Sequence, residues 1–365
     1  MNLRLPGPIP VPDDVLASMA RPMINHRGPE FKEILYRVTE RLKQVFDTAG
    51  DVYILTASGT GAMEAAVVNT LSRGDKVICV SIGSFGDRFG EIAEIFGADV
   101  VNLTFEPGTA ADPDVIRKAI LSNSDTKAVL VTHNETSTGV VNDLEAISVL
   151  VKEEFGLLLL VDGISSVCSL PLRTDAWGCD VVATASQKGW MLPPGLAFIS
   201  FSEMAWQAHS TSSMPKFYFD VAQYRKYYEI GQPPYTPGIS TMFALDLALD
   251  RIINEGMDSV YKRHAEIVRL TREGVRKLGL SVFPDEANAS DTVTAVRVPD
   301  RVDASVLLSI VQDEHGVVLA SGQEALKDKI IRIGHMGDTS IGDIQGVLDA
   351  LDAALRKLGF ETASS

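Results

Sequence analysis

Short apolar runs alternate with helical segments between residues 51 and 201, and this alternation limits the possible folds more than any other feature. Several runs are uninterrupted stretches of Val, Ile and Leu, which are typical of strands covered on both faces. The pattern predicts an α/β fold: a mostly parallel sheet built by right-handed crossovers, with helices on both faces. Seven strands are expected, at residues 52–56, 77–81, 100–103, 128–132, 157–161, 181–184 and 197–201. The intervening helices are expected at residues 62–71, 89–96, 113–121 and 144–155.

Three parts are expected in a chain of 365 residues, which is too long for one compact core. Residues 1–22 should form an arm, 23–257 a large domain that holds the sheet, and 258–365 a smaller α+β domain. Prolines at every second position from Pro6 to Pro12 predict an extended arm that lies across a partner subunit. In the smaller domain, strands are expected at 292–298, 317–320 and 330–333, and helices at 304–314 and 341–358.

Further helices are predicted before and after the sheet. Asp13 should cap a short helix at residues 14–19, and longer helices are expected at 29–48, 242–255 and 259–278. Residues 203–240 are expected to be irregular and are rich in aromatic side chains. Aromatic surface of this kind is typical of an interface, so we expect a partner subunit to cover it in a homodimer.

The formal net charge of −15 argues against nucleic acid or an anionic membrane as the main partner, because both attract a basic surface. No apolar stretch reaches the roughly 18 residues of a membrane span, and the first residues contain no signal-peptide core. Cys79, Cys168 and Cys179 form no C-x-x-C pair and lie in or beside apolar runs, which indicates buried free thiols in a reducing compartment. We therefore expect a soluble, cytoplasmic protein.

The loop after the first predicted strand reads T-A-S-G-T-G-A-M-E from Thr56 to Glu64. Small residues let a bound group approach the backbone, and the following helix directs its free N–H groups and positive dipole end at that group. The hydroxyls of Ser58 and Thr60 add donors. The loop has neither the G-K-[ST] of a Walker A motif nor the third glycine of a dinucleotide fingerprint. A phosphate site and a tight strand-to-helix turn both explain this stretch.

Two chemically capable side chains follow predicted strands. Asp162 ends the apolar run L-L-L-L-V, and Lys188 follows the strand at 181–184. Ligands bind at the carboxyl ends of strands in such sheets, so the two residues are expected to lie close together. A lysine with a lowered pKa forms Schiff bases with carbonyl groups, and a buried carboxylate needs a cation or a cofactor. Alternatively, Lys188 is a surface lysine and Asp162 caps the turn at 163–166.

A cofactor with an aldehyde, a ring nitrogen and a phosphate would use Lys188, Asp162 and the Ser58 loop together, and pyridoxal 5′-phosphate (PLP) has these groups. The chain resembles fold-type I PLP enzymes of the class V aminotransferase group, above all the alanine/serine:glyoxylate (serine:pyruvate) aminotransferases. The matching motifs occur in family order over nearly the whole chain, at residues 6–8, 22–27, 58–65, 132–139, 161–166, 186–188, 235–237 and 331–334. The resemblance implies a homodimer with shared active sites.

The resemblance also implies a role for each matching residue. Lys188 would form the Schiff base and move the substrate proton, and Asp162 would keep the pyridine nitrogen protonated. Phe85 would stack on the ring, where the family often has Trp or Tyr. Arg332 would clamp the substrate carboxylate, and Gly7 would contact the substrate. The other implied cofactor contacts are Ser58, Gly59, Thr60, Thr136, Gln187 and, from the partner subunit, Tyr235 and Thr236.

The expected reaction transfers the amino group of alanine or serine to glyoxylate or pyruvate. The sequence leaves two alternative functions open. One is a 2-aminoethylphosphonate or purine-pathway transaminase, and the other is a subunit of a larger complex without transaminase activity. A cysteine desulfurase is disfavoured because Gln187, rather than histidine, precedes Lys188, and no cysteine follows Cys179. A nucleotide-binding dehydrogenase is disfavoured because the Ser58 loop lacks the fingerprint and Lys188 would have no purpose.

Pro233 stands where some family members carry a phosphate-binding tyrosine, so whether Tyr235 replaces that tyrosine is open. A metal site is disfavoured, because His26, His133 and His335 show no H-x-x-x-H spacing and no Cys/His/Asp cluster accompanies them.

Overall fold

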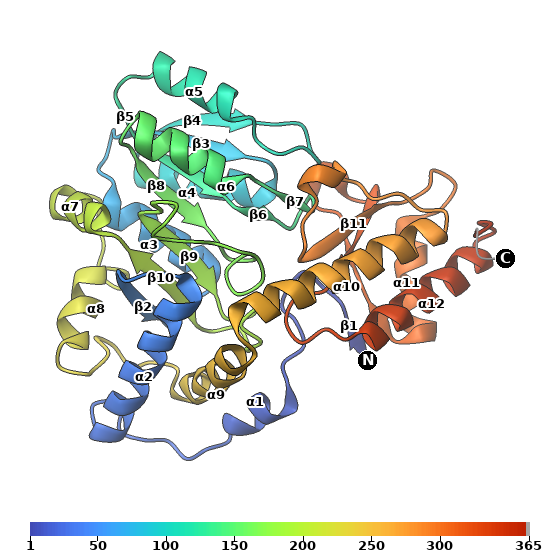
Figure 1. The fold of residues 1–365 in the computed structure, drawn as a ribbon, viewed down its shortest axis with the longest axis horizontal. Helices are drawn as coiled ribbons and strands as arrows, with labels where there is room; N and C mark the ends of the chain where they lie inside the picture. Colours follow the sequence, from blue (N-terminus) through green and yellow to red (C-terminus); the bar gives the residue numbers. More distant parts are fainter. Residues whose placement is uncertain (363–365) are drawn as a thin grey trace.

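The computed structural model describes residues 1–362 and is built around a seven-stranded sheet in the order β2-β10-β9-β8-β5-β3-β4 (Figure 1). All neighbours are parallel except β10, which runs antiparallel to β2 and β9. The strands are β2 (Asp51–Leu55), β3 (Lys76–Ser81), β4 (Asp99–Thr104), β5 (Thr126–Thr132), β8 (Leu158–Asp162), β9 (Val181–Ala185) and β10 (Ala197–Phe201). The predicted seven-stranded, mostly parallel sheet is confirmed.

Helices cover both faces of this sheet. Along β5, Val129 and Val131 pack into one apolar cluster while Ala128 and Leu130 pack into another on the opposite face. One face is covered by α3 (Gly59–Thr70), α4 (Ser84–Phe96), α7 (Glu203–Thr211) and α8 (Val221–Tyr228). The other is covered by α2 (Pro29–Phe46), α5 (Pro113–Ser122), α6 (Leu144–Ser148) and α9 (Ile239–Glu255). Burial on both sides explains why the strand sequences are continuously apolar.

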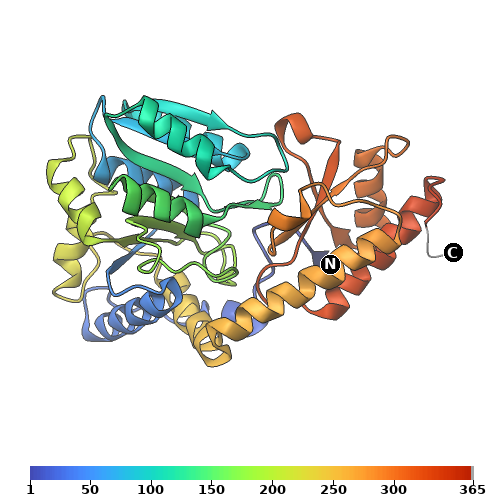
Figure 2. The same ribbon diagram turned by 45° about the horizontal axis from the view of Figure 1, so that its top comes forward.

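A smaller α+β unit follows α9, as predicted. The long helix α10 (Met257–Lys277) runs from α9 into this unit (Figures 1 and 2). Its antiparallel sheet has the order β11-β14-β13, and its core is a separate apolar cluster beneath the helices. The remaining elements of this unit are β11 (Val293–Arg297), β12 (Val317–Val318), β13 (Ala320–Ser321), β14 (Ile330–Gly334), α11 (Ala304–His315), α12 (Ile341–Lys357) and short 3₁₀ turns at Glu286–Asn288 and Glu324–Leu326.

The N-terminal segment lies against its own chain. Strand β1 (Asn2–Leu3) pairs in parallel with β12 in the smaller unit. Further along, the backbone N–H of Ile9 donates to the carbonyl of Gln187 at 3.2 Å. The arm therefore connects the smaller unit to the loop that carries Lys188.

Three local predictions differ from the structure. Asp13 does not cap the first helix: α1 (Asp13–Ser18) begins at Asp13, with Pro12 at the N-cap and no side-chain cap. Residues 203–240 are not irregular throughout, because Ser202 and Asp220 cap α7 and α8 within or beside this stretch. The helix predicted at 144–155 is α6 followed by a π-helical segment, Val149–Glu154.

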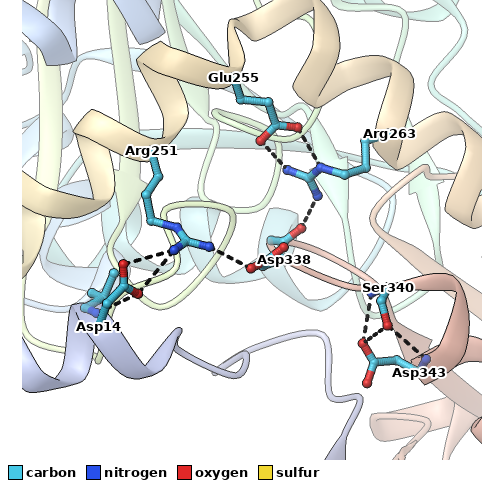
Figure 3. A network of polar contacts seen from close by, with 9 residues as sticks. Asp14, Arg251, Glu255, Arg263, Asp338, Ser340 and Asp343 are labelled. Atoms are coloured by element: carbon cyan, nitrogen blue, oxygen red, sulfur yellow. Dashed lines mark hydrogen bonds and ion pairs between the residues drawn. The ribbon is translucent and has the colours of Figure 1, made fainter.

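Charged side chains join α1, α9 and the loop before α12 (Figure 3). The guanidinium of Arg251 in α9 lies 3.0 Å from the carboxylate of Asp14 and 2.9 Å from that of Asp338. Arg263 in α10 pairs with Glu255 at 2.7 Å. Partly exposed ion pairs contribute at most about 1 kcal/mol each, so this network adds little to the stability of the fold.

The three cysteines are buried free thiols, as predicted. Burial raises the pKa of Cys79, Cys168 and Cys179 to about 12. Within residues 1–362, no helix is both long enough and apolar enough to cross a membrane.

Candidate active site

Lys188 is buried in the turn that follows β9, three residues after Ala185. Its Nζ donates to the carbonyl of Pro6 in the N-terminal arm at 2.5 Å. Burial lowers the pKa of Lys188 to about 8, and the positive charge of Arg332 acts in the same direction, while the charge of Asp162 opposes them. An amine with a pKa this close to neutrality is a ready nucleophile for an aldehyde.

Gly7 lies directly against this lysine. Its φ of +120° disfavours L side chains, and a Cβ there would lie 2.6 Å from Nζ and from Cδ of Lys188. A Gly7→Ala change is therefore expected to displace Lys188 or the arm and to weaken cofactor binding about tenfold or more, because the clash is with the reacting side chain. A fluorescence titration of the cofactor-free protein with PLP measures this.

The matched control for that variant is Gly74→Ala. Gly74 also has a positive φ of +80°, but a Cβ added there would meet no atom within 4 Å. The Gly74→Ala variant therefore has the strain of an alanine at positive φ but no steric clash with a neighbouring side chain. Equal loss of PLP affinity in both variants would mean that contact with Lys188 is not the cause.

Asp162 ends β8 and is buried beside Ala183, in the middle of β9. One carboxylate oxygen accepts the N–H of Ile164 at 2.9 Å, and the other accepts the hydroxyl of Thr132 at 3.3 Å. Burial raises the pKa of Asp162 to about 7, and these hydrogen bonds oppose the shift. The side chain thus caps the following turn with one oxygen and leaves its other oxygen with a single long contact, available to a cationic partner.

A run of seven polar residues, 132–138, is buried along its whole length. It begins at the last residue of β5 and contains β6 (Asn134–Glu135), which forms a small hairpin with β7 (Val140–Val141). The amide of Asn134 donates to Ser165 at 2.7 Å and, in the smaller unit, to Thr292 at 2.8 Å. Consecutive buried polar groups are costly unless each is hydrogen-bonded, so this segment indicates a site rather than a surface loop.

Glu135, in the middle of this run, could not be singled out from the sequence. Its side chain is fully buried and accepts backbone N–H groups from Phe85, Gly86 and Ser137. The only signal that could have drawn attention to it is the unbroken polar run between an apolar strand and Val140. The spacing of residues along the sequence does not tell which side chain of this run lies beside Lys188, Asp162 and Arg332.

Arg332 reaches the site from β14. Its Nε donates to the carbonyl of Ser321 at 2.8 Å and its Nη1 to the carbonyl of Thr136 at 3.0 Å. Burial lowers the pKa of the guanidinium, and the charge of Glu135 raises it. Within residues 1–362, no carboxylate oxygen lies within 4.0 Å of the Arg332 guanidinium, so it forms no ion pair there. A buried guanidinium held only by carbonyls can bind an incoming carboxylate.

The Ser58 loop forms the start of α3. Ser58 is the N-cap residue but makes no side-chain cap, and the hydroxyls of Ser58 and Thr60 have no partner in the described part of the chain. Gly59 is required by packing, since a Cβ there would lie 2.6 Å from the side chain of Ile164. Nearby, the side-chain oxygen of Gln187 is buried without a partner. The free donors at a helix N-terminus fit the phosphate of PLP, and Asp162 and Lys188 fit its ring nitrogen and aldehyde.

The other predicted contacts fall in different places. Phe85 lies in the first turn of α4, with the guanidinium of Arg88 4.9 Å from its ring centre. Thr136 is buried, and its hydroxyl makes no hydrogen bond within residues 1–362. Tyr235 donates its hydroxyl to the carbonyl of Phe217 at 2.8 Å in its own chain. Thr236, which follows it, is exposed.

The histidines do not gather into a metal site. Within residues 1–362, no group of three or more His, Cys, Asp or Glu side chains is placed to hold a metal ion. His133 is buried against Trp177, and burial lowers its pKa to about 4.

Known proteins match this chain over nearly its full length. The family model described as aminotransferase class-V matches residues 13–345. The small subunit of a soluble hydrogenase from Synechococcus sp. is 42% identical over 98% of this chain and 94% of its own. A serine–glyoxylate aminotransferase from Arabidopsis thaliana is 35% identical over 98% of this chain and 91% of its own. The crystal structure of an alanine–glyoxylate aminotransferase from Nostoc sp. is 30% identical, covers 97% of this chain and 95% of its own, and has a TM-score of 0.94.

The fold and these matches define a fold-type I PLP-dependent aminotransferase. The chain belongs to the class-V aminotransferase family. The family, the fold class and the cofactor predicted from the sequence are confirmed.

Proposed function

We propose that this protein transfers the amino group of a small L-amino acid, alanine or serine, to glyoxylate or pyruvate. The observation that carries the proposal is the buried guanidinium of Arg332, which has no carboxylate partner in the described chain and lies on the same site as Lys188 and Asp162. Relatives named for serine and for alanine as donors, with glyoxylate as acceptor, support this choice of substrates. Both substrates carry a carboxylate that Arg332 would hold.

The chain's own residues would divide the work as follows. Bound PLP supplies an aldehyde that joins to amines and a ring that withdraws electrons from the substrate Cα. Lys188, with its pKa near 8, would take up and return the proton at Cα. Asp162 would keep the ring nitrogen protonated, and the donors of Ser58 and Thr60 would hold the phosphate. Arg332 would orient the substrate by its carboxylate.

We further propose a cytoplasmic homodimer. Phe217, which is 79% exposed beside Tyr235, and the exposed Thr236 support the idea that this surface meets a partner's phosphate site. Three buried free cysteines fit a reducing compartment. The arm at 1–22 and domains at 23–257 and 258–365 remain our proposed division, with the arm also contacting the partner.

A second candidate is a subunit of a larger redox complex. The name of the 42% identical Synechococcus relative favours it. A chain with that role alone would have no need for a lysine, an aspartate and an arginine placed for amino transfer. The two candidates differ in one property, turnover of amino acids.

The test measures initial rates with L-serine or L-alanine against glyoxylate or pyruvate, in the presence of PLP. Because two half-reactions share one site, double-reciprocal plots at several acceptor concentrations should give parallel lines. If PLP binds but no pair reacts faster than with a Lys188→Ala control, amino transfer is the wrong function and the complex-subunit candidate gains.

Arg332→Lys is expected to raise the KM for the amino acid about tenfold to a hundredfold, because lysine keeps the charge but loses the two-pronged contact. The affinity for PLP should change less than twofold or so, since Arg332 is assigned to the substrate. Arg297→Lys is the matched control: Arg297 lies on the neighbouring strand β11 and also donates to a carbonyl, that of Phe283. A similar rise in KM in both variants would remove Arg332 from the substrate site.

A further inference from the structure

Glu135 joins two parts of the cofactor site. One of its oxygens accepts the N–H groups of Phe85 and Gly86, at 3.0 and 3.2 Å, in the first turn of α4. The other accepts the N–H of Ser137 at 3.0 Å, in the segment that also carries Thr136. Beside it, Ser137 accepts the N–H of Ser84 at 3.1 Å. The carboxylate therefore fixes the backbone of Phe85 relative to the segment that Arg332 contacts.

These contacts favour the ionised form of Glu135. Each of the two carboxylate oxygens accepts a backbone N–H group, and a hydrogen bond from the side chain of Ser137 also favours the charged form. The positive end of the α4 dipole also favours a negative charge at this position. Burial works against ionisation and raises the pKa of Glu135, whereas the hydrogen bonds from Ser137, Gly86 and Phe85 lower it.

The charge of Glu135 acts on the reactive groups around it. It raises the pKa of Lys188 and of Arg332, and it also raises the pKa of Asp162. The site thus brings together two acidic side chains and two basic ones before any ligand enters. Asp162 and Glu135 differ in their contacts: both oxygens of Glu135 accept backbone N–H groups, whereas one oxygen of Asp162 accepts only the hydroxyl of Thr132.

We propose that Glu135 is a positioning residue for the cofactor: it holds the first turn of α4 so that Phe85 presents its ring to PLP, and its charge offsets Arg332 until a substrate carboxylate arrives. This inference rests on the proposed function, because it takes Phe85 as the stacking residue and Arg332 as the carboxylate clamp. It gives the buried glutamate a task distinct from that of Asp162.

Two variants separate the hydrogen bonds to the first turn of α4 from the charge. In Glu135→Gln the amide oxygen can still accept from Phe85 and Gly86, while the negative charge and the bond from the N–H of Ser137 are lost. In Glu135→Ala both are lost. We expect Glu135→Ala to raise the Kd for PLP about tenfold or more and to reduce the visible circular dichroism of bound PLP, which reports the orientation of the ring.

For Glu135→Gln, the expected effect is on titration. The visible band of lysine-bound PLP changes with pH, and a nearby negative charge favours the protonated form. Loss of the Glu135 charge should therefore move the midpoint of this pH titration to lower pH by at least about half a unit, while Asp162 and Arg332 are unchanged. Ser137→Ala is the matched control, because it removes a neighbouring bond to the same helix turn without changing charge, and its midpoint should not move.

Two results would overturn the inference. One is a Glu135→Ala protein that binds PLP within about twofold of the wild type with unchanged circular dichroism. The other is a Glu135→Gln protein in which the visible band titrates with the same midpoint as in the wild type. This second result overturns the inference even if the alanine variant fails to fold. Absence of a visible band in the wild type would instead refute the proposed function, so the two failures are distinguishable.

Discussion

Replacing Lys188 with alanine should lower kcat for amino transfer by roughly 10⁴-fold or more, because one side chain both joins to the cofactor and moves the substrate proton. The variant should bind PLP but lack the visible band of the lysine-bound form. Steady-state rates and absorption spectra of the purified variant measure both effects. A small primary amine added to the assay should restore part of the rate, since it can enter the space left by the side chain and carry the proton.

Lys188→Arg is the control for charge and length. Arginine keeps a cation that can donate to the carbonyl of Pro6, as Lys188 does at 2.5 Å. Its guanidinium stays protonated and is not a nucleophile. The arginine variant should therefore be as inactive as the alanine variant but closer to the wild type in thermal stability. Substantial activity in either variant would show that the reacting amine belongs to another residue.

Asp162→Asn should lower kcat about 10³-fold, because an asparagine cannot hold the ring nitrogen in its protonated form. The change is nearly isosteric, and the amide oxygen can still accept the N–H of Ile164. KM should change much less than kcat if the carboxylate acts mainly in the transition state. A variant with kcat within tenfold or so of the wild type would contradict the assignment of Asp162 to the ring nitrogen.

The same variant has a second readout in the cofactor-free protein. Burial raises the pKa of Asp162 to about 7 in the folded state, above the ordinary value of about 3.9. The folded state therefore binds the proton more tightly, and the stability from this group falls as the pH rises from about 4 to 7. Asparagine does not ionise, so Asp162→Asn should be more stable than the wild type at pH 8, by up to a few kcal/mol, and similar at pH 4. Denaturant unfolding at both pH values measures this.

The sheet and two of its reactive residues could be predicted because their signals are local. Apolar strands buried on both faces leave continuous runs of Val, Ile and Leu, and the strand order places their carboxyl ends together. Asp162 and Lys188 each follow such a run, so their proximity follows from the topology. The register between β8 and β9, in which Asp162 faces Ala183, is what brings them together.

The other parts of the site depend on contacts between distant segments, for which spacing gives no signal. The carbonyl of Pro6 meets Lys188 across 182 residues of sequence. Arg332 lies in a short strand whose apolar sequence fits an exposed edge strand equally well. In the structure it is buried and donates to the carbonyls of Thr136 and Ser321. Glu135 looked like one polar residue among seven. Its role depends on where the first turn of α4 lies.

We propose that Lys188, Asp162 and Arg332 form one site that moves an amino group, and a spectrum of a single half-reaction tests this most directly. The PLP-loaded protein is mixed with L-serine or L-alanine, without an acceptor, and then with glyoxylate. We predict that the visible band is replaced by a near-ultraviolet band of the amine form of the cofactor and returns when glyoxylate is added. A visible band that no amino acid alters, in a protein that has bound PLP, would contradict the claim.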